Sequence, residues 1–240
     1  MAARHGRWIT GVVAAAAMAA SGLGAAPRTE KGMTLQPPAE HVSMGKVYYV
    51  LPGKDGQITF TSDAPLEHIK GTSSRVIGYA VAPTDAAQAG ALLAGEFVLP
   101  VGSLNTGIPM RDEHLRSDRW MGAESHPDIV FTLKEVKDAK VAKQDAGFTT
   151  WQVTLVGDMT IRGVSKPMSV PARITSMPES EKTKARAPGD LLALRCEYAV
   201  KLSDFGIATN EPAVQSGKVS DEITLDTFLL LSTVSPEAGR

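Results

Sequence analysis

The 240-residue sequence has little cysteine, few aromatic residues and no excess of either charge. It contains one Cys, which excludes an internal disulfide. The five His and this Cys show no pair at metal-ligand spacing such as CxxC or HExxH, so we expect no metal and no resident cofactor. The 25 Lys and Arg nearly balance the 26 Asp and Glu, so no basic surface is available to neutralise a phosphate backbone. We therefore expect no nucleic-acid partner.

The first 26 residues have the composition of a secretory signal peptide. Arg4 and Arg7 precede a stretch from Trp8 to Ala20 that is rich in Ala and Val, and Gly24 and Ala26 fit the small residues of a signal-peptidase site. The apolar stretch is short for a membrane span, which needs about 20 apolar residues, so an uncleaved anchor is the weaker alternative. We predict cleavage after Ala26 and a periplasmic or secreted protein without an integral membrane span.

The remaining chain reads as one domain. Residues 27–45 combine three prolines with polar residues and show no sustained apolar period, which predicts a linker or an irregular lead-in. The fold is expected over residues 46–234, followed by a tail at 235–240. This length suits one domain with a sizeable core and is short for two.

An alternation of apolar and polar residues dominates this domain and predicts half-buried strands. It is clearest over 151–161, 168–175 and 192–202, less clean over 129–133 and 223–231, and weaker over 58–62, 75–82 and 92–101. The segment Arg162-Gly163-Val164-Ser165 predicts a hairpin connection between two of the strands. Strands of ten or more residues favour a closed, tilted barrel, although a sandwich of two sheets is also compatible with the alternation.

A charged segment at residues 104–121 interrupts the strand pattern and predicts short helical turns. In one interpretation, Arg111 and His114 bind an anionic or carbonyl head group and Asp112 orients them. In the other, these residues lock a connection between strands, with Asp112 and Asp118 capping short helices and Arg111 in a structural ion pair. The residues alone leave both interpretations open.

Several motifs together resemble those of the YceI-like domain family. They are Ser103–Gly107 (SLNTG), Met110–Ser117 (MRDEHLRS), Trp120, His126–Phe131 (HPDIVF), Val156–Pro167 (VGDMTIRGVSKP) and Asp204–Ile207 (DFGI). The resemblance extends from about residue 46 to residue 234. It implies an all-β fold, a lipocalin-like antiparallel barrel of about eight strands with short helical turns in one connection. It also implies an exported protein whose apolar lumen holds a polyisoprenoid or another long amphipathic lipid.

With this resemblance, the inward-facing side chains become candidates for lining a lipid cavity. The candidates are Phe131, Trp151, Val153, Leu155, Met159, Met168, Val170, Ile174, Leu194, Tyr198 and Val200. Gly157 and Ala172 would leave room beside them, and Arg111, Asp112 and His114 are the head-group candidates. In the alternative, the side chains fill the barrel completely and leave no cavity.

Other functions are compatible with the same pattern. An enzyme acting on a lipid could use His114 as acid or base, but it would need a nucleophile or a metal, for which no motif is present. An outer-membrane barrel would require girdles of aromatic residues, whereas only 5% of the chain is aromatic. A structural or stress-protective exported barrel without a ligand is a further alternative. Phe228 and Leu230 leave a homodimer open.

Overall fold

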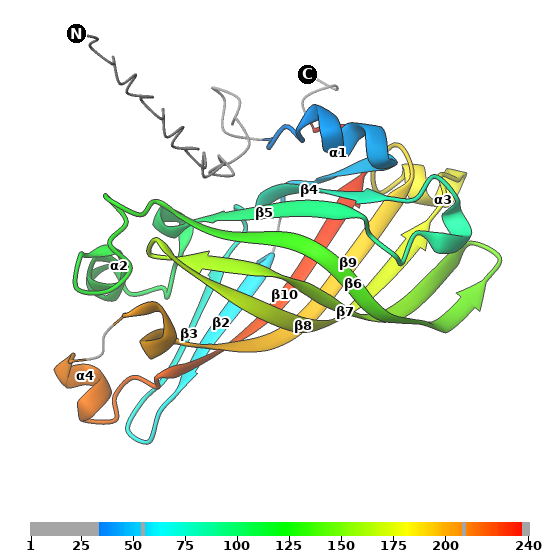
Figure 1. Ribbon diagram of the computed structural model, residues 1–240. Helices are drawn as coiled ribbons and strands as arrows, with labels where there is room; N and C mark the ends of the chain where they lie inside the picture. The colour runs from blue at the N-terminus through cyan, green and yellow to red at the C-terminus, as the bar shows by residue number, and fades with distance from the viewer. Residues whose placement is uncertain (1–33, 54–55, 208–209, 237–240) are drawn as a thin grey trace, which may run out of the picture.

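The computed structural model describes residues 34–53, 56–207 and 210–236, and the expected signal peptide at 1–26 lies outside them. An antiparallel sheet forms most of this structure (Figure 1). Its strands are β1 (Lys46–Val50), β2 (Ile58–Asp63), β3 (His68–Ser73), β4 (Ile77–Ala82), β5 (Ala94–Pro100), β6 (Asp128–Asp145), β7 (Phe148–Ile161), β8 (Val164–Met177), β9 (Leu191–Lys201) and β10 (Glu222–Ser232).

The sheet closes into a barrel because β1, its first strand, pairs both with its neighbour β4 and with β10. The strand order is β1-β4-β5-β6-β7-β8-β9-β10-β2-β3, and β1 also pairs with β10. Eight strands, β1 and β4 to β10, therefore form a closed ring. The barrel expected from the sequence resemblance is confirmed.

The pair β2–β3 continues the pair β1–β4 after an interruption. Along β10, Val50 lies opposite Leu231 and Ile58 lies opposite Thr227, so seven residues separate the paired positions on the β1–β2 side where β10 has only three. The buried side chain of Gln57 fills the interruption. Its amide oxygen accepts a hydrogen bond from Val76 N at 2.8 Å, and its amide nitrogen donates to Leu51 O at 3.0 Å. One side chain thus pairs backbone groups that the strands leave free.

The hairpin that joins β7 to β8 has the tight geometry of a two-residue connection. Ile161 pairs with Val164, and Arg162 and Gly163 between them have φ values of 50° and 74°. Two successive positive φ angles are those of a type I′ turn, whose twist matches the right-handed twist of the strands. The sequence predicted the hairpin but left its turn type undetermined.

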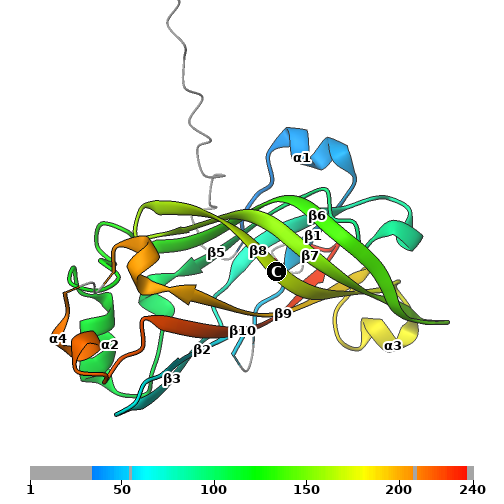
Figure 2. The same ribbon diagram turned by 60° about the horizontal axis from the view of Figure 1, so that its bottom comes forward.

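Short helices connect the strands and cover the ends of the barrel. They are α1 (Ala39–Met44), η1 (Ala86–Gln88), η2 (Val101–Ser103), α2 (Pro109–Arg116), α3 (Glu181–Lys184), η3 (Leu202–Phe205) and α4 (Pro212–Gln215). Figure 2 shows α2 and α4 together at one end of the barrel and α3 towards the other. Helix α2 lies in the charged segment at 104–121 for which helical turns were predicted. None of the helices in the described part of the chain is long and apolar enough to cross a bilayer.

Residues 34–45, the described part of the lead-in, are more ordered than their composition indicates. Residues 27–45 were expected to be a linker or irregular, yet α1 forms within them and Leu35 is buried against Tyr79 and Val81 of β4. These two strand residues face outwards, and His41 Nδ1 lies 2.8 Å from the Tyr79 hydroxyl. The segment therefore covers the outer face of β4. Proline and polar residues hid this role from the sequence pattern, because Leu35 is the one buried apolar side chain among residues 34–45.

The sequence pattern located most strands but shortened some and missed others. Strands β1 and β3 were not predicted, and β6 continues to Asp145, twelve residues beyond the predicted end at Leu133. The second half of β6 is exposed and departs from regular register at several points, with Asp138 at a φ of 54°. Its charged residues face water on both sides, so no apolar alternation marks it as a strand.

Candidate functional site

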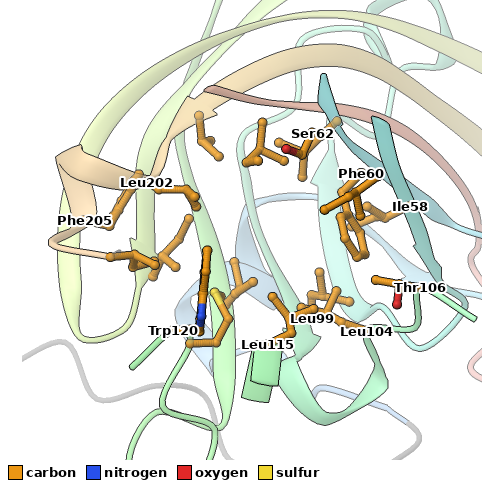
Figure 3. A pocket seen from close by; sticks show the side chains of 18 of the residues that line it. Ile58, Phe60, Ser62, Leu99, Leu104, Thr106, Leu115, Trp120, Leu202 and Phe205 are labelled. Atoms are coloured by element: carbon orange, nitrogen blue, oxygen red, sulfur yellow. The ribbon is translucent and has the colours of Figure 1, made fainter. Parts of the chain in front are cut away.

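A cavity of about 680 Å³ occupies the part of the barrel interior next to α2, η3 and α4. Its wall consists mainly of apolar side chains that point inwards from the strands (Figure 3). Ile58 and Phe60 come from β2, Leu99 comes from β5, and Trp120 follows α2. We call the end of the barrel at α2, η3, α4 and the β2–β3 turn the mouth. The volume lies in the range usual for sites that enclose most of a small ligand.

The structure places most of the predicted lining residues in the cavity wall. Those in the wall are Phe131, Leu155, Met159, Val170, Leu194, Tyr198 and Val200. Met168 packs against the core, outside the wall. Trp151, Val153 and Ile174 also point inwards, but they are buried in the packed core beyond the cavity.

These three residues belong to the end of the barrel opposite the mouth, which side chains fill. Trp151 is 4% exposed and lies so close to Gly90 that a Cβ atom there would be 2.4 Å from the indole Cγ. Val153, Ile174 and Leu92 belong to the same packed cluster. The cavity therefore occupies only part of the barrel length. Alternation reveals which side chains point inwards, but not how completely they fill the space.

Gly157 does not leave room for a ligand, contrary to the expectation. A Cβ atom on Gly157 would lie 2.2 Å from the carbonyl oxygen of Thr132 and 2.8 Å from Cζ of Phe131. The phenyl ring of Phe131 therefore fills the space above this glycine and forms part of the cavity wall. Gly157 shapes the wall by admitting an aromatic ring.

Sequence reasoning missed the part of the wall formed by other strands and by the mouth. The missed residues include Ile58, Phe60, Ile69, Phe97, Leu99, Ile129, Ile161, Leu225, Thr227 and Leu229 on strands, and Leu115, Trp120, Leu202, Phe205 and Ile207 at the mouth. The alternation of Ile58, Phe60 and Ser62 was a usable signal. In β10 the signal was hidden, because Phe228 and Leu230 on the outer face are also apolar and lie beside α3 residues Lys182 and Thr183.

Charged side chains gather at the mouth. The Arg111 guanidinium lies 2.5 Å from a carboxylate oxygen of Glu67, which belongs to the β2–β3 turn. Arg119, which follows α2, pairs with Glu211, which precedes α4, at 2.9 Å. Arg111 and His114 both contribute to the cavity wall. The mouth therefore combines apolar walls with ionisable groups, and its two ion pairs connect α2 to neighbouring segments.

Asp112 has a structural position and does not line the cavity. Its side chain is 7% exposed, and one carboxylate oxygen accepts hydrogen bonds from the backbone N–H and the hydroxyl of Thr106, at 2.8 Å and 2.7 Å. It thereby fixes the loop before α2. Of the three head-group candidates, the structure brings Arg111 and His114 to the cavity and directs Asp112 away from it.

Several of the sequence motifs meet around Arg162 in the β7–β8 turn. Its guanidinium donates hydrogen bonds to the carbonyl oxygens of Asp118, at 2.6 Å, and Gly206, at 3.1 Å. The adjacent Gly163 lies against the ring of His126, which would be 3.0 Å from a Cβ atom at this position. The turn thus connects the segment after α2 to the segment after η3. The motifs that contain these residues therefore have a structural role, because they hold the segments of the mouth together.

The single thiol of the chain lies within the barrel. Cys196 is 7% exposed and borders the cavity. Burial raises the pKa of its thiol to about 12, so the thiol stays protonated near neutral pH. Within the described residues, no group of three or more His, Cys, Asp and Glu side chains is placed to hold a metal ion.

The model of the YceI-like domain family matches residues 40–229. The chain is 30% identical over 128 residues to UPF0312 protein YE1254 of Yersinia enterocolitica. This match covers 53% of this chain and 56% of that protein. It is 28% identical over 123 residues to Protein YceI of Escherichia coli O157:H7, covering 51% of this chain and 54% of that protein. These matches span about half the length of the curated relatives.

Solved structures share the fold over a larger part of the chain. BcnA of Burkholderia cenocepacia has a TM-score of 0.55 and 18% identity, and the match covers 77% of this chain and 96% of BcnA. A polyisoprenoid binding domain from Saccharophagus degradans, described as implicated in plant cell wall breakdown, has a TM-score of 0.52 and 16% identity, covering 77% and 97%. At these identities the likeness establishes the fold alone.

Proposed function

Because the chain belongs to the YceI-like domain family, whose model covers residues 40–229, we propose that it is a binding protein for a long-chain lipid. In this proposal it is exported and non-catalytic, and it holds a polyisoprenoid or another long amphipathic lipid in the barrel lumen. A solved polyisoprenoid binding domain of the same fold supports this choice of ligand class.

The observation that carries the proposal is the apolar cavity of about 680 Å³ that reaches the mouth of the barrel. Wall residues such as Phe60, Leu99 and Leu225 would contact a hydrocarbon chain over much of its surface. Transfer of each methylene group from water to such a site is worth about 0.8 kcal/mol. A chain of several isoprene units would therefore gain substantial affinity from burial alone.

The mouth supplies groups for the polar end of the lipid. Arg111 carries a permanent positive charge and His114 offers ring nitrogens, and both border the cavity. An anionic or carbonyl head group could accept hydrogen bonds from them while its chain lies in the lumen. The pairing of Arg111 with Glu67 fits this role, because a ligand anion could share or replace the carboxylate.

The state of the only thiol supports a binding function over a catalytic one. A cysteine nucleophile reacts as the thiolate, and burial disfavours the thiolate of Cys196 at neutral pH. In the structure described, no hydrogen bond from another side chain orients His114, as a general base would require.

Export is the second part of the proposal and has its own test. The composition of residues 1–26 supports cleavage after Ala26, which would leave a chain that starts at Pro27. We expect the intact mass of the protein isolated from the periplasm or the medium to equal that of residues 27–240. An unprocessed mass in the cytoplasmic fraction would contradict export.

The binding proposal is tested by filling the cavity with a larger side chain. Leu225 on β10 borders the cavity, whereas the adjacent Thr224 is exposed on the outer face. We expect Leu225→Trp to lower the uptake of a long polyprenol at least tenfold, because the indole would occupy space that the chain needs. Thr224→Trp adds the same side chain outside the barrel and should bind like the wild type.

Both variants and the wild type would be titrated with the polyprenol and compared in a thermal denaturation assay. Equal uptake by folded Leu225→Trp and by the wild type would refute binding in this cavity. Absence of uptake by the wild type, with polyprenols and fatty acids alike, would refute the lipid-binding function itself.

A further inference from the structure

Polar side chains inside the barrel, away from the mouth, are confined to one place in the cavity wall. The charged wall residues, such as Glu67, Arg119 and Lys218, come from the turns and helices of the mouth. Of the uncharged polar wall residues, Ser62, Thr106 and Ser117 lie at or next to the mouth. The three further inside are on adjacent strands, Cys196 and Tyr198 on β9 and Thr227 on β10.

The register of β9 and β10 brings these three side chains together. Cys196 lies directly opposite Thr227, and Tyr198 lies opposite Leu225, two residues nearer the mouth. Because side chains alternate along a strand, all of them point into the lumen. Tyr198 precedes Leu202 at the mouth by four residues, which is about 13 Å of strand. The group is therefore well inside the barrel.

The hydroxyl of Thr227 is not fully satisfied by the protein. The residue is 5% exposed, and its Oγ1 atom is buried with no partner at hydrogen-bonding geometry within the described residues. The hydroxyl is nevertheless close enough to Cys196 and Tyr198 to affect their pKa values. Burial raises the pKa of both groups, and the Thr227 hydroxyl offsets part of that rise. A buried polar group without a well-formed partner destabilises a protein unless something else supplies one.

Tyr198 is the member of this set that is only partly buried, whereas Cys196 and Thr227 are buried. Its side chain contributes to the cavity wall, and burial raises the pKa of its phenol, so the phenol remains an O–H donor at all physiological pH values. A hydrocarbon chain offers this donor no acceptor. A carbonyl oxygen would accept its hydrogen bond, while the Thr227 hydroxyl could donate to the phenol oxygen and strengthen that bond.

We propose that Tyr198, supported by Thr227, is a hydrogen-bonding site inside the lumen for a neutral carbonyl group carried along the chain of the ligand. The inference rests on the proposed function, because it specifies which long-chain compounds the cavity prefers. Esters, ketones and amides share the required oxygen. A carboxylate is excluded, because the cationic wall residues Arg111, Arg119 and Lys218 belong to the mouth and would leave a buried anion unpaired.

The experiment compares two ligands of equal length with a pair of isosteric variants. Dissociation constants for a long-chain ketone and for the alkane of the same carbon number, each delivered from cyclodextrin, would be measured by displacement of an environment-sensitive dye. A series of ketones with the carbonyl at successive positions identifies the one that reaches Tyr198. Tyr198→Phe and Thr227→Val each remove one hydroxyl and keep the shape of the side chain.

Tyr49→Phe is the matched control, since Tyr49 lies on the outer face of β1. We expect Tyr198→Phe to raise the ratio of ketone to alkane dissociation constants about fivefold, the effect of one net hydrogen bond, and Thr227→Val to raise it by a smaller factor. In Tyr49→Phe the ratio should equal that of the wild type. A ratio unchanged by Tyr198→Phe for every ketone in the series would overturn the inference. If neither ligand class binds the wild type, the proposed function fails instead.

Discussion

The space above Gly157 determines the position of a ring in the cavity wall. A Cβ atom of residue 157 would lie 2.8 Å from the Phe131 ring, and the Thr132 carbonyl oxygen approaches the same point from the backbone of β6. The oxygen cannot move without disturbing the pairing of β6 with β7, which brings Leu133 opposite Gly157. Glycine at this position is thus required by close packing between neighbouring strands.

Replacing Gly157 with Ala should therefore lower the free energy of unfolding by about 2 kcal/mol, the usual cost of overpacking a filled site. Gly147 is the control, because a Cβ atom there would meet no heavy atom within 4 Å. Chemical denaturation of both variants gives the comparison. A Gly157→Ala variant as stable as Gly147→Ala would show that β6 and β7 adjust freely and that the glycine is not required.

Arg111 and His114 are expected to recognise charge at the mouth. Replacing both with Ala should weaken binding of a long-chain carboxylate or phosphate about tenfold relative to binding of an uncharged chain of equal length, because a charge-assisted hydrogen bond is lost. Calorimetric titration of both ligands into the variant and the wild type measures this selectivity. Glu67→Gln, which breaks the same ion pair without removing the cation, separates ligand contact from a purely structural effect.

If the double variant still prefers the charged ligand as strongly as the wild type does, Arg111 and His114 do not bind the head group. They would then have the structural role that was the alternative interpretation of the sequence. Asp112 has a structural role, but the capping role of that alternative is wrong, because Asp112 lies within α2, whose first turn has no side-chain cap, and instead binds Thr106. Residue types alone could not separate the two roles. An Arg and a His three residues apart on a helix share a face in either case.

At the scale of elements, Asp190 joins strands at the end of the barrel opposite the mouth. It directly precedes β9, and its carboxylate accepts hydrogen bonds from Lys46 Nζ at the start of β1, at 2.6 Å, and from Glu179 N after β8, at 2.8 Å. The bond from Lys46 is the largest cause of the lowered pKa of Asp190. The Glu179 N–H and the lysine charge lower it further, while burial opposes the change.

Because the pKa of Asp190 is lower in the folded than in the unfolded chain, its contribution to stability is fully present above the unfolded value of about 4. It is lost as the pH falls through the folded-state value. Asp190→Asn should therefore be less stable than the wild type at pH 7, by about 1 kcal/mol, and this difference should shrink in acid. Asp204→Asn, at an exposed position, is the control. Chemical denaturation over a range of pH tests the prediction, and a difference that stays constant into acid would contradict it.

Strands with strong alternation were predicted clearly, strands with weaker alternation such as β4 were predicted less clearly, and β1 and β3 were not predicted. Strands β7, β8 and β9 bury one face and expose the other, so their sequences record their orientation. Strand β4 buries both faces, because Leu35 covers Tyr79 on the outside while Ala80 faces the core. Strand β3 contains Lys70 and Gly71 and has few apolar residues to mark it. In β4, the contact that buries the second face comes from Leu35, a residue distant in sequence.

At the scale of the whole molecule, the sequence motifs predicted the family and the barrel but not the extent of the cavity. Trp151 and Leu155 lie on the same face of β7, and only Leu155 borders the cavity. The difference depends on Gly90, which lies in the connection between β4 and β5 and allows the indole ring to fill one end of the barrel. Such filling is decided by residues that are remote in sequence, so alternation along one strand could not reveal it.

The homodimer suggested by Phe228 and Leu230 also stays a prediction. Phe228 is 42% exposed on the outer face of β10, with the Arg195 guanidinium 6.0 Å from the centre of its ring. A cation over an aromatic ring is a common surface arrangement and does not require a partner chain.

Native mass spectrometry can show whether the barrel carries a long-chain lipid. The protein would be purified without detergent, its intact mass measured, and the bound material extracted into organic solvent and identified. We expect one isoprenoid or long-chain lipid per molecule of the wild type and of Thr224→Trp, and none in Leu225→Trp. A ligand-free mass for the wild type that persists after incubation with polyprenols and fatty acids would contradict this expectation.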